Sequence, residues 1–202
     1  MKGLYLVTPD WDDTDKLVAA SEQAIAGGAT LLQYRHKTAD SHLRTEQASA
    51  LLALCRRLNV PLIINDHVAL CEQLDADGIH VGGTDASVAE VRARLGKEKI
   101  VGASCYGDLQ LARNAVAAGA SYVAFGGFYP SRVKKYEVTT PPDIITRALA
   151  EIDVPLCVIG GMTIDNSRPL IALGAHMVAA ISSVYSVGDH RSAASAFADL
   201  FR

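Results

Sequence analysis

The stretch LCVIGGMTIDNSRPLIALGAHMVAAISS, residues 156–183, contains one complete copy of the repeat that decides the fold. Short apolar runs at residues 156–159 and 177–181 begin and end it. Their hydrophobicity is continuous rather than alternating, which is typical of strands covered on both faces. Gly174-Ala175 stands before the second run, where a glycine can adopt the left-handed conformation that ends a helix. The stretch therefore predicts a strand, a helix and a second strand.

The same unit recurs along the whole sequence. Apolar runs rich in β-branched residues predict strands at residues 4–7, 30–34, 62–64, 78–81, 100–103, 122–125, 156–159 and 177–181. Stretches with helical spacing lie between them, for example at residues 15–26, 41–58 and 108–118. Further Gly-Ala or Ala-Asp returns occur at residues 28–29, 76–78 and 119–120.

Eight strand–helix units permit either a closed barrel or an open, doubly wound sheet. A GxGxxG motif does not follow the first strand, which disfavours a dinucleotide-binding half. We therefore predict the α/β class and a single (β/α)₈ TIM barrel domain that spans residues 1–202.

Composition narrows the class of protein further. The net charge of −3 argues against a nucleic-acid binder, which normally carries a basic face. The four cysteines stand singly without a CxxC pair, so reduced, buried thiols are expected rather than disulfides or a zinc site. The first apolar run is too short for a signal peptide, and no segment approaches the roughly 18 apolar residues of a membrane span. We expect a cytoplasmic protein that binds neither nucleic acid nor membrane.

Catalytic groups of such barrels lie at the C-terminal ends of the strands. The second predicted strand ends in Gln33-Tyr34-Arg35-His36-Lys37. Alternate side chains of a strand face the same way, so Gln33, Arg35 and Lys37 are expected together over the barrel mouth. Two cations and an amide suit a polyphosphate ester. The alternative is that Arg35 and Lys37 are solvated loop residues.

Two carboxylates follow the third and fourth predicted strands. They are Asp66, in Ile64-Asn65-Asp66, and Asp85, in Gly82-Gly83-Thr84-Asp85. Mg²⁺ favours one or two carboxylates together with phosphate and water, so this pair near the cations indicates a magnesium site. The alternative is that each aspartate caps the helix that follows it, expected to begin near Val68 and near Ser87.

Other polar residues stand at the remaining strand ends. His80, within the fourth strand, is expected to be a hydrogen-bonded core residue. Ser104 can hydrogen-bond an anionic ligand, but a Gly-x-Ser-x-Gly elbow is missing and a nucleophilic serine is not expected. The basic loop after the sixth strand is long enough to act as a lid, with Ser131 and Lys134 as ligand groups; an ordinary basic surface loop is the alternative.

The last two strand ends predict a phosphate cradle. Gly160-Gly161 follows the seventh strand, and Ile181-Ser182 ends the eighth. Loops after these two strands, with a short extra helix, often bind phosphate in such barrels. Glycines also let backbone N–H groups approach an anion closely.

In this order, the motifs resemble the thiamine phosphate synthase family from Leu4 to Ser182. The family's Gln-x-Arg-x-Lys, Ile-Asn-Asp and Gly-x-x-Asp motifs match residues 33–37, 64–66 and 82–85. The resemblance implies condensation of hydroxymethylpyrimidine diphosphate with hydroxyethylthiazole phosphate, giving thiamine phosphate and pyrophosphate. It implies Mg²⁺ as cofactor, and it assigns roles to the following residues. Asp66 and Asp85 bind the metal; Arg35, Lys37 and Lys134 are catalytic; Gln33, Asn65, Ser104 and Ser131 bind substrate; and Gly161, Ile181 and Ser182 hold the thiazole phosphate.

The sequence departs from the family pattern at three places. Val133 replaces the second threonine of Thr-x-Thr-Lys, Gly83 replaces a glutamine, and Lys135-Tyr136-Glu137 stands where Pro-Gly is frequent. The related thiazole tautomerases lack the two aspartates and use a histidine where this chain has Tyr106, which favours a synthase. A non-catalytic, phosphate-binding barrel is a further alternative, because fold alone does not exclude it. The Ala-rich outer helices are compatible with a homodimer interface, and a helical core explains them equally well.

Overall fold

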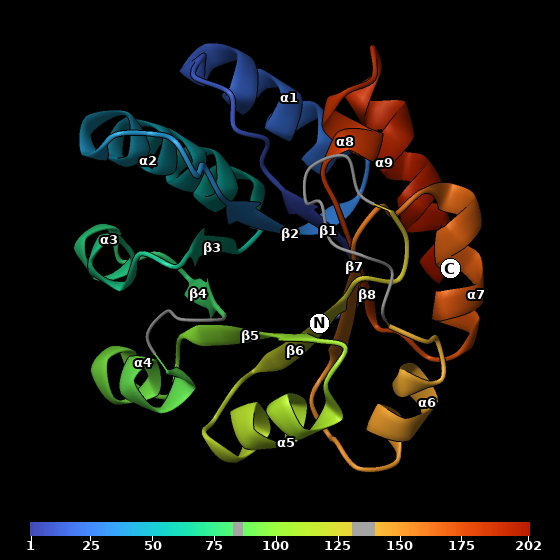
Figure 1. The fold of residues 1–202 in the computed structure, drawn as a ribbon. Helices are drawn as coiled ribbons and strands as arrows, with labels where there is room; N and C mark the ends of the chain where they lie inside the picture. Colours follow the sequence, from blue (N-terminus) through green and yellow to red (C-terminus); the bar gives the residue numbers. More distant parts are fainter. Residues whose placement is uncertain (83–86, 131–139) are drawn as a thin grey trace.

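The computed structural model describes residues 1–82, 87–130 and 140–202 and shows a closed barrel of eight parallel strands (Figure 1). Each strand pairs with the next, and β8 returns to pair with β1. The predicted barrel is confirmed. The strands are β1 (Gly3–Val7), β2 (Ala29–Tyr34), β3 (Leu62–Asn65), β4 (Gly78–Val81), β5 (Ile100–Tyr106), β6 (Tyr122–Gly126), β7 (Leu156–Ile159) and β8 (Met177–Ala180).

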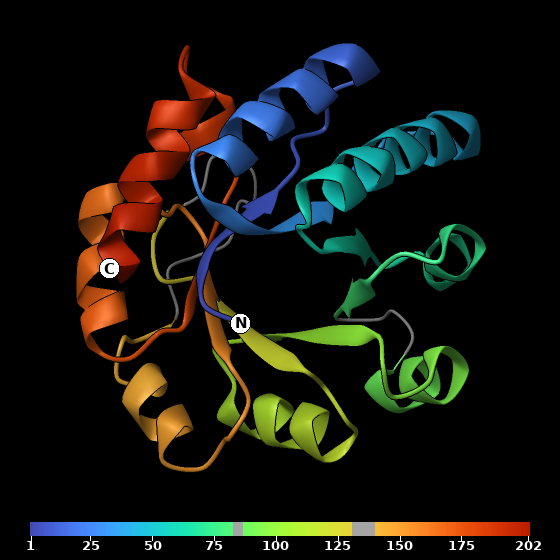
Figure 2. The same ribbon diagram turned by 180° about the vertical axis from the view of Figure 1, so that it is seen from behind.

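Helices surround the strands as an outer ring, and the reverse view in Figure 2 shows α9 beside α1, where the ring closes. An added Cβ at Gly27, just after α1, would lie 2.4 Å from the Arg191 carbonyl oxygen of α9, so this approach requires glycine. The helices are α1 (Thr14–Ala26), α2 (Ser41–Leu58), α3 (Val68–Leu74), α4 (Val88–Leu95), α5 (Leu109–Ala117), α6 (Ile144–Leu149), α7 (Ile164–Ala172), α8 (Ser182–Tyr185) and α9 (His190–Ala198), followed by a 3₁₀ turn (Asp199–Phe201).

The helix-to-strand returns follow the glycine prediction at three of four places. Gly28, Gly119 and Gly174 have φ values of 109°, 96° and 107°. At the fourth return Asp75 takes the left-handed conformation, with φ 52°. Gly78 serves a different purpose there, because an added Cβ would lie 2.2 Å from the carbonyl oxygen of Ile100 on the neighbouring strand.

The apolar side chains form two layers. The larger layer lies between the strands and the helices, and a smaller cluster, which includes Tyr5, Tyr122 and Cys157, fills the barrel interior. All four cysteines are buried and unpaired, as predicted. In the part of the chain that the structure describes, no helix is both long and apolar enough to cross a membrane.

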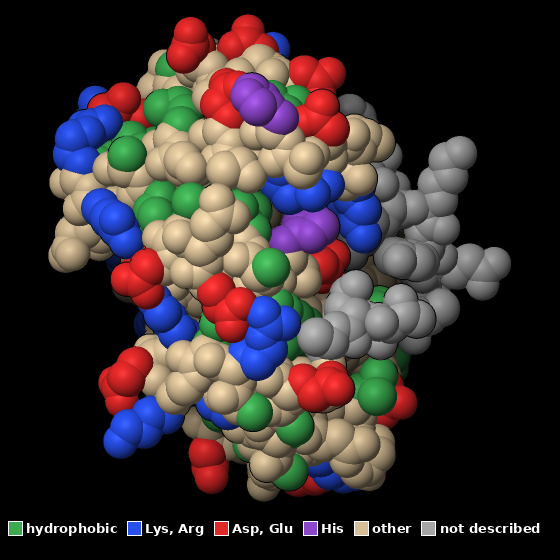
Figure 3. Space-filling view, turned by 90° about the vertical axis from the view of Figure 1, so that its left-hand side faces the viewer, with side chains coloured by type: hydrophobic (Ala, Val, Ile, Leu, Met, Phe, Trp, Pro, Cys, Tyr) green, Lys and Arg blue, Asp and Glu red, His purple; other side chains and the backbone are tan. Residues whose placement is uncertain are grey.

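The outer face over α2, α3 and α4 mixes acidic and basic side chains (Figure 3). Arg94 pairs with Glu72 across α3 and α4, and Lys99 Nζ lies 2.6 Å from Asp75 Oδ1. Such exposed pairs contribute at most about 1 kcal/mol each to stability. This face therefore lacks the single-sign field expected of a nucleic-acid binder.

Candidate active site

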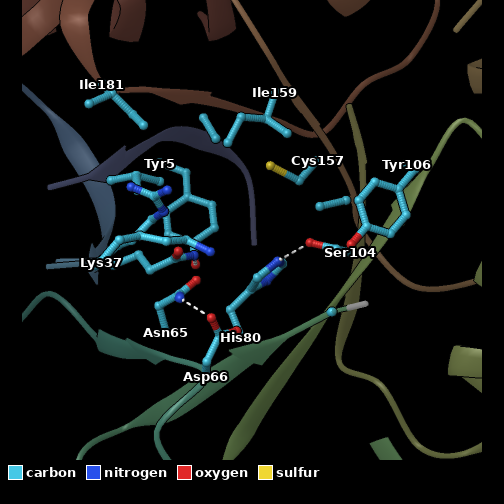
Figure 4. A pocket seen from close by; sticks show the side chains of 16 residues that line it. Tyr5, Lys37, Asn65, Asp66, His80, Ser104, Tyr106, Cys157, Ile159 and Ile181 are labelled. Carbon is cyan, nitrogen blue, oxygen red and sulfur yellow. Dashed lines mark hydrogen bonds between the residues drawn. The ribbon is translucent and has the colours of Figure 1, made fainter. Parts of the chain in front are cut away.

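A pocket opens at the C-terminal ends of the strands, where the sequence predicts the catalytic groups (Figure 4). Strands on all sides of the barrel contribute to its lining. The predicted site residues that line it are Gln33, Arg35, Lys37, Asn65, Asp66, Ser104 and Ile181. Three others, Asp85, Ser131 and Lys134, lie outside the described residues, as do Gly83 and Val133.

The end of β2 directs its alternate side chains into this pocket. Gln33 is 5% exposed and Arg35 is 8% exposed, so the alternative of a solvated loop residue is wrong for Arg35. Lys37 is exposed and still lines the pocket. The buried Thr8 hydroxyl holds this segment, since it donates to the Arg35 carbonyl (2.9 Å) and accepts from the Arg35 N–H (2.8 Å). Asp10 Oδ1 lies 3.4 Å from Arg35 Nη1.

His36 faces away from the pocket, as strand alternation requires. Its Nδ1 accepts the backbone N–H of Ala39 at 3.1 Å, and its Nε2 lies 3.1 Å from Asp12 Oδ1. Because Nδ1 is an acceptor, the neutral ring carries its proton on Nε2 and donates it to Asp12. This contact anchors the segment that carries Arg35 and Lys37.

Asn65 and Asp66, at the end of the neighbouring strand β3, line the same pocket as Arg35 and Lys37. Asn65 Nδ2 donates to Asp66 Oδ2 at 2.6 Å, and the Asp66 backbone adopts φ 62°. The capping alternative is wrong for Asp66, because His67 occupies the N-cap position of α3 and makes no side-chain cap bond. The cap of α4 is Ser87, which forms a reciprocal capping box with Glu90, so the cap considered for Asp85 belongs to Ser87.

The donor set suits Mg²⁺. The described residues hold no cluster of three or more His, Cys, Asp or Glu side chains that would bind a metal by itself. Mg²⁺ does not require one, since it is commonly bound by one or two carboxylates with substrate phosphates and waters. The Asp66 carboxylate lines the pocket together with Arg35 and Lys37, which favour phosphate at the same place.

A buried polar network crosses the barrel interior below the mouth. Gln33 Nε2 donates to the Tyr5 hydroxyl (2.7 Å), which lies 2.7 Å from the Tyr122 hydroxyl. His80 Nδ1 is 2.8 Å from the Tyr122 hydroxyl, and His80 Nε2 is 2.8 Å from Ser104 Oγ. We call these five residues the interior network. His80 is hydrogen-bonded as expected, but it also lines the pocket, which the sequence did not predict.

Titratable side chains deep in the barrel stay protonated. Burial raises the pKa values of Tyr5 and Tyr122 well above the ordinary value for tyrosine. Burial likewise raises the pKa of Cys157, which lines the pocket, so that its sulfur remains a thiol. Cys157 therefore is not an activated nucleophile, and this agrees with the missing serine elbow.

Gly161 of the predicted phosphate cradle is required by the packing of the chain itself, whether or not a phosphate is bound. Gly161 adopts φ 62°, and an added Cβ would lie 2.2 Å from the Pro130 carbonyl oxygen. The glycine is thus needed for the close approach of the segment after β6. The predicted extra helix is α8, which begins at Ser182 after the N-cap residue Ile181. Ile181 lines the pocket, whereas Gly161 and Ser182 lie outside its lining.

Strand β5 continues past its predicted end at Ala103 as far as Tyr106, and Tyr106 lies at the rim of the pocket. The pairing of β5 with β6 shifts register between Ser104 and Tyr106, and Tyr106 takes φ 52° with 42% of its surface exposed. The resemblance to the thiazole tautomerases would place a histidine at this position. The chain has a tyrosine here, and a phenol does not replace an imidazole at neutral pH.

Comparison with known proteins identifies relatives over the whole chain. Residues 4–184 match the family described as thiamine monophosphate synthase. The thiamine-phosphate synthase of Janthinobacterium sp. (strain Marseille) is 68% identical over 201 residues, which covers 100% of this chain and 97% of that relative. The enzyme of the same name from Nitrosospira multiformis is 46% identical, covering 99% of this chain and 86% of that relative.

A solved structure shares the fold as well. Thiamine phosphate pyrophosphorylase from Pyrococcus furiosus superimposes with a TM-score of 0.85 at 27% identity, covering 98% of this chain and 95% of that one. The sequence and the barrel are thus matched over almost the full length by proteins of the same description. This chain belongs to the thiamine monophosphate synthase family.

Proposed function

We propose that this protein joins hydroxymethylpyrimidine diphosphate to hydroxyethylthiazole phosphate, forming thiamine phosphate and releasing pyrophosphate. One observation carries the proposal: Arg35, Lys37, Asn65 and Asp66 converge at one pocket mouth from the neighbouring strands β2 and β3. Cations, an amide and a carboxylate in this arrangement suit a metal-bound diphosphate. A barrel that only holds a monophosphate has no use for them.

In this proposal the protein stabilises the charge that grows on the leaving diphosphate. Arg35 supplies a planar fork of N–H donors, and its burial makes each charged hydrogen bond stronger than it would be in water. Lys37 and Asn65 donate to further phosphate oxygens. Lys134, outside the described residues, is proposed to act in the same way, together with the hydroxyl of Ser131.

Asp66, together with Asp85, would hold Mg²⁺, which when bound neutralises charge on the diphosphate. Asn65 orients the Asp66 carboxylate through their 2.6 Å hydrogen bond. The left-handed backbone at Asp66 is one that aspartate and asparagine adopt more readily than most residues, so the side-chain position is built into the strand end.

Bond breaking needs no protein nucleophile. The C–O bond to the diphosphate breaks and its electron pair leaves with the diphosphate, while the electron-rich aminopyrimidine carries the positive charge. Gln33 and Ser104 position this ring. The thiazole phosphate, held by Gly161, Ile181 and Ser182, then uses the lone pair of its ring nitrogen to form the new C–N bond. Holding both reactants in register supplies much of the rate.

The test is an assay of the purified protein with both substrates, with and without Mg²⁺, that scores thiamine phosphate and pyrophosphate. The proposal expects both products in equal amounts and only with Mg²⁺. Folded protein that binds thiazole phosphate but yields neither product would contradict it and favour a tautomerase or a ligand-binding barrel. The four buried, unpaired thiols support a reducing, cytoplasmic location for this activity.

A further inference from the structure

The hydrogen bonds of the interior network run in one direction. Gln33 Nε2 can only donate, so the Tyr5 oxygen accepts from it. Tyr5 is 1% exposed, and its own proton must therefore go to Tyr122, since a buried donor without an acceptor is costly. Tyr122 in turn donates to His80 Nδ1, which leaves the histidine proton on Nε2. His80 Nε2–H then donates to Ser104 Oγ.

The direction fixes what each end of the network offers to a ligand. Gln33 uses an N–H on Tyr5, so its carbonyl oxygen, Oε1, is available as an acceptor. Ser104 Oγ accepts from His80, so its own proton is available as a donor. Both side chains line the pocket, Gln33 from β2 and Ser104 from β5. The pocket thus presents an acceptor on one wall and a donor on another.

We propose that Tyr5, Tyr122 and His80 are positioning residues that preset Gln33 as an acceptor and Ser104 as a donor, and thereby select an aminopyrimidine over an oxopyrimidine. This inference rests on the proposed function. An aminopyrimidine offers an exocyclic N–H donor and unprotonated ring nitrogens as acceptors, which complements the two ends. In an oxopyrimidine the exocyclic oxygen is an acceptor and a ring nitrogen carries a proton, so both contacts become mismatched.

Neighbouring glycines make room for the network. An added Cβ at Gly102 would lie 2.1 Å from Tyr122 Cζ and 2.2 Å from its hydroxyl oxygen. An added Cβ at Gly82 would lie 2.5 Å from Ser104 Cβ. The Tyr122 ring is also stacked on His80, with centroids 5.6 Å apart. The glycines and the stacking thus allow Tyr122, His80 and Ser104 to pack closely against one another.

Both tyrosine hydroxyls of the network stay protonated, so each can donate one hydrogen bond. Because burial raises the pKa values of Tyr5 and Tyr122, each contributes one hydroxyl proton throughout the neutral range. Reversal would require the Gln33 amide to turn over and the His80 proton to move from Nε2 to Nδ1 together. The two ends of the network are coupled, although Gln33 and Ser104 are separated by three intervening side chains.

The direct test is ¹⁵N NMR of histidine-labelled protein without ligand, with the His80 signals assigned through His80→Gln. We expect the Nε2–H tautomer in the wild type. In Gln33→Glu the carboxylate can only accept, so the network should reverse and His80 should become the Nδ1–H tautomer. The matched control is Tyr185→Phe, which removes another buried tyrosine hydroxyl, 2.9 Å from Ser21 Oγ, and should leave His80 unchanged. An Nδ1–H wild type, or the same tautomer in Gln33→Glu, would overturn the proposal.

A kinetic cycle gives a second, independent reading. Tyr5→Phe should lower kcat roughly three- to tenfold, the worth of one neutral hydrogen bond, and should narrow discrimination against the oxopyrimidine diphosphate. In a Gln33→Ala background the same change should have less than a twofold effect, because Tyr5 reaches the pyrimidine through its hydrogen bond with Gln33. Equal effects in both backgrounds would overturn the network. A wild type that makes no thiamine phosphate would instead contradict the proposed function, and the tautomer measurement would still decide the network.

Discussion

Replacing Arg35 with glutamine should reduce catalysis far more than stability. Arg35 is 8% exposed and lines the pocket, so its guanidinium is placed to stabilise charge on the departing diphosphate. Loss of one preorganised donor to a developing oxyanion costs about 2.7–4 kcal/mol, or about 10²–10³ in kcat. The free energy of unfolding should fall much less. The Asp10 partner is 35% exposed at 3.4 Å, and such a screened pair contributes at most about 1 kcal/mol.

The assay is steady-state formation of thiamine phosphate at saturating Mg²⁺ and thiazole phosphate, with thermal unfolding measured on the same samples. Asp10→Asn is the matched control. It removes the ion pair but keeps the side-chain oxygen that accepts the Lys37 backbone N–H at 3.0 Å. The kcat should therefore stay within about threefold of wild type, the effect of one long, partly exposed ion pair. An Arg35→Gln enzyme that is folded and within threefold of wild-type kcat would refute the reasoning.

Two substitutions and one chemical probe test other parts of the structure. Asp66→Asn should raise the Mg²⁺ concentration needed for half-maximal rate and lower kcat at least about 100-fold. Its circular dichroism spectrum should not change, because asparagine tolerates φ 62°. Normal Mg²⁺ dependence would exclude Asp66 as a ligand. Gly161→Ala should lower the Tm by roughly 2–10 °C and raise KM for thiazole phosphate selectively, since its Cβ meets the Pro130 carbonyl; an unchanged Tm would show that the approach relaxes. Burial raises the thiol pKa of Cys71 to about 11 and that of Cys105 to about 12, so both thiols stay neutral below that range. A thiol reagent at pH 8 should therefore modify the four buried cysteines rapidly only after denaturation. Fast reaction of the native protein would contradict this.

The barrel and the polar mouth could be predicted because they depend on local periodicity. Continuous apolar runs identify buried strands, and a period of two places Gln33, Arg35 and Lys37 on one side at the end of β2. Asn65 and Asp66 follow from the rule that parallel strands end at the same rim. The side chains that line the pocket are therefore placed there by short-range geometry combined with one fact about the fold.

The interior network could not be predicted by the same reasoning. Strands β1 and β6 are apolar on both faces, so alternation alone does not say whether Tyr5 and Tyr122 face the barrel interior or the helices. Their hydroxyls meet across 117 positions of sequence, a contact that only the closed barrel creates. The capping alternative for Asp66 and Asp85 also depended on exact helix boundaries. Both aspartates stand near a predicted helix start, but His67 and Ser87 occupy the N-cap positions.

A crystal structure of the protein with Mg²⁺, pyrophosphate and thiamine phosphate tests the central claim most directly. We expect pyrophosphate oxygens within hydrogen-bond distance of Arg35, Lys37 and Asn65, with Mg²⁺ between them and the Asp66 carboxylate. We also expect the phosphate group of thiamine phosphate to lie against Gly161 and Ser182. Pyrophosphate bound away from the ends of β2 and β3, or a metal that does not contact Asp66, would contradict the proposed diphosphate site.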